Sequence, residues 1–191
     1  MNSPVTIVTG VPRSGTSLLM QILAAAGHPL LADAERPPDE GNPRGYLEYA
    51  PVKNLARDSS WLPAARGHAL KVIHALVPSL PPTETYRVLV LSRPWPEVVA
   101  SQRALLARLG RPAPTLTDAA LAALYETQFH GLVRHLAARP EASHLIVAHA
   151  DLVRAPETVL PRLADFLPDP GLDWDRARSA VDPALYRNRS S

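Results

Sequence analysis

The chain has 191 residues, of which 46% are hydrophobic and 20% are charged, and this balance is typical of a folded globular protein. Its length favours a single domain that spans residues 1–191. The absence of cysteine excludes disulfides and thiolate zinc sites. The formal net charge is only +2 and the arginines are spread along the chain, whereas a nucleic-acid-binding protein needs a clustered basic face. We therefore expect no nucleic-acid partner.

No stretch of the sequence is long and apolar enough to span a bilayer, so we expect no membrane association. Residues 1–9 carry neither the basic region nor the cleavage site of a secretory leader. These two observations favour a soluble protein of the cytoplasm. Nothing in the sequence indicates an oligomeric state.

Short apolar, β-branched runs alternate with helical patterns along the chain. The runs predict strands buried on both faces at residues 5–9, 69–73, 87–92 and 144–148. Helical periodicity with prolines and glycines at the ends predicts helices at residues 16–26, 94–109, 118–138, 156–167 and 173–181. The alternation predicts an α/β fold of three layers, a parallel sheet with helices on both faces, as in P-loop NTPases. In such a fold the ligand lies beyond the carboxyl ends of the strands.

The longest predicted helix has its own internal pattern. Asp118 stands where a capping residue would begin it. A single face would carry Leu121, Leu124, Gln128, Leu132 and Leu136. The sequence therefore predicts an amphipathic helix with these residues on one stripe.

Residues 10–17, Gly-Val-Pro-Arg-Ser-Gly-Thr-Ser, follow the first predicted strand and open the first predicted helix. They match the phosphate-binding P-loop pattern at every fixed position except the lysine, which is Thr16 here. The loop amides would surround an anion at the positive end of the helix. In NTPases this lysine reaches the β- and γ-phosphates of the nucleotide, and magnesium is bound nearby. Because the lysine is absent here and Arg13 is present, we expect arginine to balance the charge of the bound anion, with no metal required. Asp151, after the fourth predicted strand, leaves a degenerate metal site as an alternative.

Arg93 and Ser101 form a second candidate anion site. Arg93 ends the third predicted strand, and Ser101 lies about two turns into the helix that follows. If the first and third strands are neighbours, both residues face the same crevice as the loop. Two anion sites on one crevice indicate a ligand with two separated anionic groups.

A family resemblance follows from these motifs. The loop from Pro12 to Ser17 resembles the 5′-phosphosulfate loop of sulfotransferases that use 3′-phosphoadenosine 5′-phosphosulfate (PAPS), and Arg93 with Ser101 resembles that family's 3′-phosphate site. Residues 42–48, Asn-Pro-Arg-Gly-Tyr-Leu-Glu, are similar to a segment of many bacterial members. The resemblance implies transfer of a sulfonate group from PAPS to a hydroxyl or amine of a small-molecule or carbohydrate acceptor. It implies that the donor is bound by Pro12, Arg13, Ser14, Gly15, Thr16, Ser17, Arg93 and Ser101.

The C-terminal residues match the family only loosely. Tyr186 would stack on the adenine and Arg187 would pair with a phosphate, or both belong to a plain basic tail. Residues 32–50 and 110–119 are expected to frame the acceptor pocket. Trp61, Trp95 and Trp174 either line an apolar site or pack in the core.

Several residues are candidates for the chemistry. Arg13 and Lys71 would stabilise charge on the departing phosphate, although Lys71 has the alternative role of pairing with Glu48. The general base is open among Glu48, Glu40 and His74. His74 stands in a segment that resembles the family's Lys-x-His, with one residue too many between the two. Two other functions stay possible on the residues alone: a P-loop phosphotransferase, and a non-catalytic nucleotide-binding relative.

Overall fold

The computed structural model of the chain describes residues 3–33, 37–39 and 42–182. Within these residues, four parallel strands form a sheet in the order β2-β1-β3-β4. The strands are β1 (Val5–Gly10), β2 (Ala69–Lys71), β3 (Tyr86–Ser92) and β4 (Ala142–Ala148). Gly10 pairs with Leu91, so β1 and β3 are direct neighbours and end at the same level. The four predicted strands and their parallel arrangement are confirmed.

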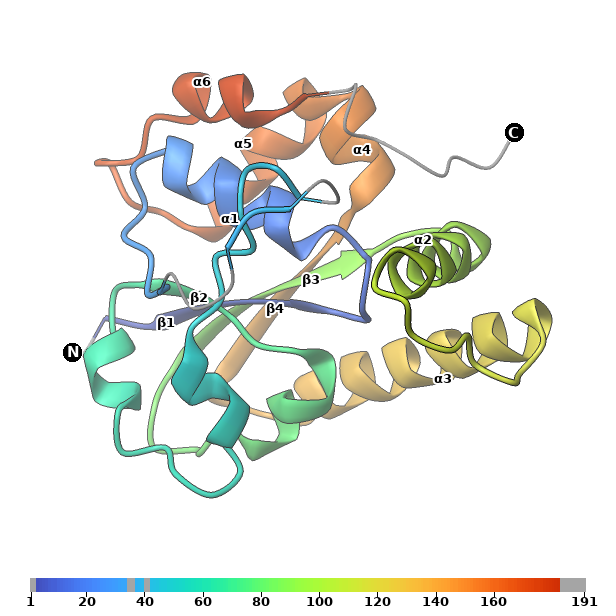
Figure 1. Cartoon of the computed structure of the whole chain (residues 1–191). Helices are drawn as coiled ribbons and strands as arrows, with labels where there is room; N and C mark the ends of the chain where they lie inside the picture. The colour runs from blue at the N-terminus through green and yellow to red at the C-terminus, as the bar shows by residue number, and fades with distance from the viewer. Residues whose placement is uncertain (1–2, 34–36, 40–41, 183–191) are drawn as a thin grey trace.

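Helices cover both faces of this sheet, as Figure 1 shows. One face carries α1 (Thr16–Ala25), α4 (His149–Arg154), α5 (Pro156–Phe166), α6 (Trp174–Ala177) and the 3-10 turn η4 (Arg178–Ala180). The other carries α2 (Trp95–Arg108), α3 (Asp118–Ala137) and the 3-10 turns η1 (Ala50–Asn54), η2 (Leu62–Ala65) and η3 (His74–Ser79). The predicted three-layer α/β fold is confirmed. Of the helices described, none is long and apolar enough to cross a membrane.

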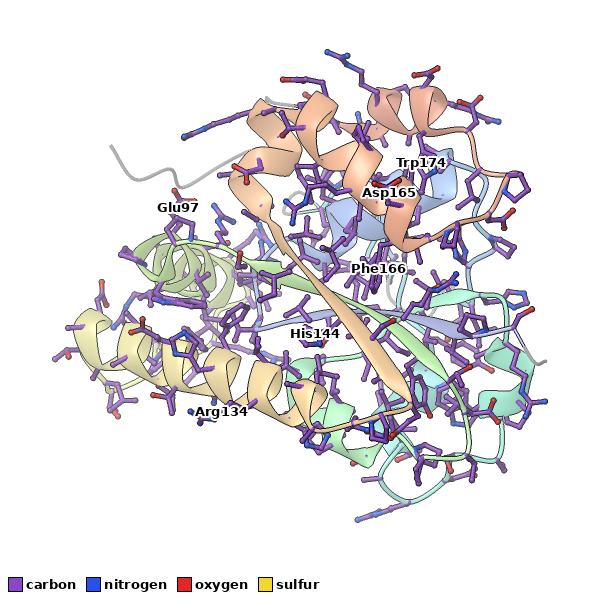
Figure 2. The ribbon with its side chains drawn as sticks, turned by 180° about the vertical axis from the view of Figure 1, so that it is seen from behind. Glu97, Arg134, His144, Asp165, Phe166 and Trp174 are labelled. Atoms are coloured by element: carbon purple, nitrogen blue, oxygen red, sulfur yellow. The ribbon has the colours of Figure 1, made fainter. Side chains whose placement is uncertain are left out.

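The core divides into two clusters, one on each face of the sheet. Alternate residues of β1 serve the two sides, because successive side chains of a strand point in opposite directions. Ile7 packs toward α3 and the 3-10 turns, whereas Val8 packs toward α1 and α5. Both residues have no exposed surface. Phe166 and Trp174, labelled in Figure 2, are partly buried and pack against the second cluster.

Some predicted boundaries are wrong by a few residues. β2 ends at Lys71 rather than at 73, and the predicted helix at 173–181 divides into α6 and η4. The cap of α3 is Thr117, not Asp118: Thr117 has an extended backbone, and its side-chain oxygen accepts a hydrogen bond from the Ala120 N–H at 3.2 Å. β4 lies at the sheet edge, so Ile146 remains 38% exposed instead of buried.

The predicted stripe of α3 is also partly wrong. Leu121, Leu132 and Leu136 are buried, but Leu124 is 42% exposed. The buried face runs through Phe129, which is 7% exposed and packs on Trp95 with a ring separation of 5.4 Å. At 3.6 residues per turn, Phe129, Leu132 and Leu136 fall on one side of Leu121 around the helix axis, and Leu124 falls on the other side.

Leu124 and Leu132 provide a matched pair for testing this packing. Leu132→Ala removes a buried side chain from the core and should lower the free energy of unfolding by about 2–4 kcal/mol. Leu124→Ala should change it by less than about 1 kcal/mol, because its side chain is already largely in water. Urea unfolding followed by circular dichroism measures both values. Equal losses would contradict the assigned face of α3.

Candidate active site

The P-loop (residues 10–17) connects the end of β1 to α1 through a backbone that requires its glycines. Gly15 has φ of 105°, a left-handed value that residues with a side chain rarely adopt. A Cβ on Gly15 would also lie 2.2 Å from Cδ2 of His149. A Cβ on Gly10 would lie 2.4 Å from Oγ of Ser14 and 2.9 Å from the carbonyl oxygen of Leu91. Steric exclusion of a side chain therefore explains why both fixed positions of the P-loop pattern are glycine.

A cavity of about 380 Å³ opens beside the P-loop. It collects most of the residues predicted for the site: Pro12, Arg13, Gly15, Thr16, Ser17, Glu48, Lys71 and Arg93. Ser14, Ser101 and His74 do not line it. Glu40, Tyr186 and Arg187 lie outside the described residues, so their predicted roles stay predictions.

Ser14 is held inside the P-loop instead of facing the cavity. Its side chain has no exposed surface, and its backbone N–H donates to the Val11 carbonyl at 3.2 Å. Thr16 and Ser17, at the start of α1, do line the cavity. Of the hydroxyls in the loop, these two are therefore placed to meet a ligand.

Arg13, Arg93 and Ser101 lie in contact with one another rather than at two separate places. Arg13 Nε donates to Ser101 Oγ at 3.0 Å, and Arg93 Nη1 donates to the carbonyl oxygen of Arg13 at 3.3 Å. Ser101 is thus reached through Arg13, although it does not line the cavity itself. The predicted proximity of Arg93 and Ser101 to the P-loop is confirmed, but of the two only Arg93 lines the cavity, and the two anion sites expected here stay predictions.

Glu97, which sequence reasoning missed, fixes the orientation of Arg93. Arg93 Nε donates to Glu97 Oε2 at 2.9 Å, and the two side chains are only 7% and 3% exposed. Glu97 lies in the first turn of α2, as Figure 2 shows. Such a pair needs both partners, because removing one leaves a buried charge without compensation. The signal was present in the sequence as a spacing of four residues between opposite charges.

Lys71 reaches the P-loop from the neighbouring strand β2. Its Nζ donates to Ser17 Oγ at 2.9 Å and to the carbonyl oxygen of Tyr46, and it lies 3.9 Å from Glu48 Oε1. Lys71 is 7% exposed, whereas the Glu48 side chain is 31% exposed and reaches the cavity. Lys71 therefore contacts the P-loop and pairs with Glu48 at the same time, and its role in stabilising charge on a departing phosphate stays a prediction.

Hydrogen bonds hold the segment at residues 42–48 in the position that brings Glu48 close to Lys71. Gly45 has φ of 85°, and its carbonyl oxygen accepts hydrogen bonds from Asn42 Nδ2 at 2.7 Å and Gln21 Nε2 at 3.4 Å. Arg44 Nη1 donates to the carbonyl of Ala180 at 2.6 Å. The segment therefore crosses α1 and is attached to η4 on its far side.

His149 is a second residue that sequence reasoning did not select. It begins α4 directly after β4, lines the cavity and is 6% exposed. Burial and the positive charge of Arg93 together lower its pKa to about 4, against the opposing effect of the negative charge of Glu97. Its position directly after a strand could have indicated this role from the sequence, because the carboxyl ends of parallel strands lie on the side of the sheet where ligands bind.

The remaining candidates lie elsewhere. His74 begins η3, where its Nε2 hydrogen-bonds Gln128 Oε1 at 3.1 Å and burial lowers its pKa.

Of the two segments expected to frame the acceptor pocket, residues 110–119 contribute nothing to the lining of the cavity. Residues 32–50 contribute through Asn42, Pro43, Tyr46 and Glu48. Trp61 packs on Tyr49 at a ring separation of 5.3 Å and, like Trp95 and Trp174, does not line this cavity.

The alternative of a degenerate metal site finds no support in the residues described. Asp151 is exposed on α4, away from the cavity lining. Within the described ranges, no group of three or more histidine or acidic side chains is arranged to hold a metal ion. The cations that line the cavity are Arg13, Lys71 and Arg93, and the carboxylates of Glu48 and Asp182 line it as well.

Two solved structures share this fold. The sulfotransferase domain of the olefin synthase of Synechococcus PCC 7002 aligns with a TM-score of 0.51 and 18% identity, over 100% of this chain and 90% of that one. A sulfotransferase from Alicyclobacillus acidocaldarius aligns with a TM-score of 0.52 and 13% identity, over 97% and 89%. No protein-family model matches the sequence, and no curated protein matches it. At these identities the likeness shows the fold: the chain has the P-loop-like α/β architecture of these sulfotransferases.

The steric role of Gly15 can be tested against a second glycine. Gly15→Ala should lower the free energy of unfolding by about 1–3 kcal/mol, because the new Cβ is strained by φ and strikes His149. Gly131→Ala is the control: it lies within α3, its Cβ would meet nothing within 4 Å, and it should raise stability by up to about 1 kcal/mol. Chemical denaturation measures both. A Gly15→Ala protein as stable as the wild type would contradict the packing described.

Proposed function

We propose that the protein is a sulfotransferase that transfers a sulfonate group from PAPS to a hydroxyl or amine of a small-molecule or carbohydrate acceptor. The observation that carries this proposal is one cavity lined by the P-loop, by Arg93 and by the Lys71–Glu48 pair. The fold shared with sulfotransferases supports it.

The residues present fit the donor. A volume of about 380 Å³ lies in the range of small-molecule sites, which is about 300–1,000 Å³. Arg13 and Arg93 offer planar guanidinium groups, which suit phosphate and sulfate oxygens. Both residues line the cavity, and two guanidinium groups there suit a nucleotide with two anionic groups. Lys71 adds a cation at the opposite side of the P-loop, where it contacts Ser17.

The chemistry assigned to the chain is an in-line displacement at sulfur. A bond forms between the acceptor atom and sulfur, the bond from sulfur to the 5′-phosphate oxygen breaks, and that oxygen keeps the electron pair. Lys71 and the Ser17 hydroxyl are held together before any ligand arrives, so they can stabilise the new negative charge with little rearrangement. This preorganisation is the main catalytic contribution we assign to the P-loop region.

Glu48 is the base that the geometry favours. Its carboxylate lines the cavity beside Lys71, whereas His74 is bonded to Gln128 and does not line it. A carboxylate in this position can accept the proton that the acceptor hydroxyl or amine loses. Glu40 remains a second predicted base outside the described residues.

Donor binding is tested with adenosine 3′,5′-bisphosphate, the nucleotide product of the proposed reaction. We expect micromolar binding by calorimetry, weakened about 10- to 100-fold when Arg93 and Glu97 are both changed to Gln, since charge-assisted hydrogen bonds are lost. The paired change leaves no buried charge without its partner. The control is Arg103→Gln with Asp118→Asn, a largely exposed pair that joins α2 to α3, which should change affinity less than twofold.

The same titration with ATP and magnesium separates the proposal from a P-loop phosphotransferase. Tight binding of magnesium ATP without binding of the bisphosphate would overturn the proposed donor. Binding of the bisphosphate with an unaffected double variant would instead remove Arg93 from the donor site.

Glu48 is tested by turnover. A screen of alcohols, amines and sugars with radiolabelled PAPS identifies an acceptor, and Glu48→Gln should then lower kcat by about 10²–10⁴-fold. Binding of adenosine 3′,5′-bisphosphate should change little, because the amide keeps the shape of the side chain. Glu157→Gln, at a 55% exposed position on α5, is the control and should retain full turnover. Full turnover of Glu48→Gln would assign the base to another residue.

A further inference from the structure

Three neighbouring strands deliver three different groups to the same end of the sheet. β1 ends in the P-loop, β3 is followed by Arg93, and β4 is followed by His149. Ser92 pairs with Ala148, so Arg93 and His149 are each the next residue after a paired position on adjacent strands. Both line the cavity. The fold therefore places an imidazole in the anion site at a position equivalent to that of an arginine.

The contact between His149 and the P-loop shows which edge of the ring faces the loop. A Cβ built on Gly15 would meet Cδ2 at 2.2 Å and Nε2 at 3.1 Å. The Cδ2–Nε2 edge thus lies against the backbone of residue 15, where α1 is about to begin. This is the end of the helix at which N–H groups and the helix dipole favour negative charge. An anion bound there would lie close to the ring.

We propose that His149 is a proton-coupled anion-binding residue: it takes up a proton from solvent when an anionic ligand enters the cavity, and its imidazolium then donates a hydrogen bond to that ligand. The anion has the phosphate or sulfate chemistry that the P-loop and Arg93 favour. This inference rests on the proposed function for the identity of the probe, adenosine 3′,5′-bisphosphate.

The charges around His149 explain why the ligand would control its protonation. Arg93, from the end of β3, disfavours the imidazolium, and Glu97, from α2, favours it. The P-loop contacts the ring through Gly15, which carries no charge. Together with burial, these groups hold the pKa of His149 at about 4, so the ring is neutral at pH 7 in the free protein. An anion beside the ring adds a further negative charge, and an opposite charge within about 4–6 Å shifts a pKa by about 1–3.

The change in the pKa of His149 on binding sets how ligand affinity depends on pH. Because the bound anion raises the pKa of His149, the complex holds more protons than the free protein at a pH between the two values. Affinity then increases as the pH falls from neutral, and the gain stops growing below a pH of about 4, where the free ring is protonated as well. For a change in pKa of about 2, the affinity gain between pH 7 and pH 5 is about tenfold.

The experiment measures this gain by calorimetry with adenosine 3′,5′-bisphosphate at pH 7, 6 and 5. Each titration is made in two buffers of different ionisation enthalpy, which counts the protons taken up on binding. The ligand phosphates also titrate in this range, so the quantity of interest is the difference between the wild type and His149→Gln. The wild type should gain about tenfold more affinity than this variant and take up more protons. His144→Gln, on β4 and outside the cavity lining, is the control and should behave as wild type (Figure 2).

The outcomes separate the two proposals. Equal pH dependence and proton uptake in the wild type and His149→Gln would overturn the role of His149 and leave the donor unaffected. No binding by the wild type at any pH would overturn the proposed donor, and the role of His149 with it. If His149→Gln does not fold by circular dichroism, nitrogen NMR of the histidine rings in the wild type replaces it. The buried ring with the lowest pKa should then titrate at a higher pH once ligand is added, and an unchanged titration would contradict the proposal.

Discussion

The direct pairing of β1 with β3 is the constraint on which the site depends. Gly10 lies opposite Leu91, so the P-loop begins level with the end of β3, and Arg93 emerges next to Arg13. An intervening strand would separate them by about 5 Å more, beyond hydrogen-bond distance. The order of the strands thus decides that the P-loop and Arg93 line the same surface. Glycine at position 10 is part of the same constraint, since a Cβ there would strike the backbone of Leu91.

The cations of this surface are each held by a partner that limits their repulsion. Arg93 is paired with Glu97, Lys71 lies near Glu48 and the Tyr46 carbonyl, and Arg13 donates to Ser101. Like charges in a cavity would otherwise cost stability, because the low local dielectric strengthens their repulsion. The partners also fix the side chains before a ligand arrives, which reduces the ordering cost of binding. Carboxylates beside an anion site are therefore consistent with its proposed function.

The fold and the order of its motifs could be predicted from the sequence because they depend on local signals. The apolar run of β1, the apolar run of β3, the helix after Thr16 and the spacing of Gly10 and Gly15 are each contained within a short stretch of the chain. Contacts between distant segments could not be predicted in this way. Nothing near Ser14 indicates that its hydroxyl turns inward, and nothing near His149 indicates that its ring meets Gly15, 134 positions earlier in the chain. Such contacts depend on tertiary packing, which also decides that Leu124 rather than Phe129 is exposed.

The replacement of the P-loop lysine by Thr16 finds its structural counterpart in β2. Lys71 pairs in register with Val8, so its side chain approaches the start of α1 from the neighbouring strand and donates to Ser17. The loop therefore keeps a primary amine within hydrogen-bond distance of its last residue, although the amine belongs to another segment. This origin matters for chemistry, because an amine attached to β2 is also 3.9 Å from Glu48. Lys71 thus contacts both Ser17 and Glu48, so the residue proposed to stabilise the leaving oxygen and the residue proposed to accept the proton lie side by side in the same cavity.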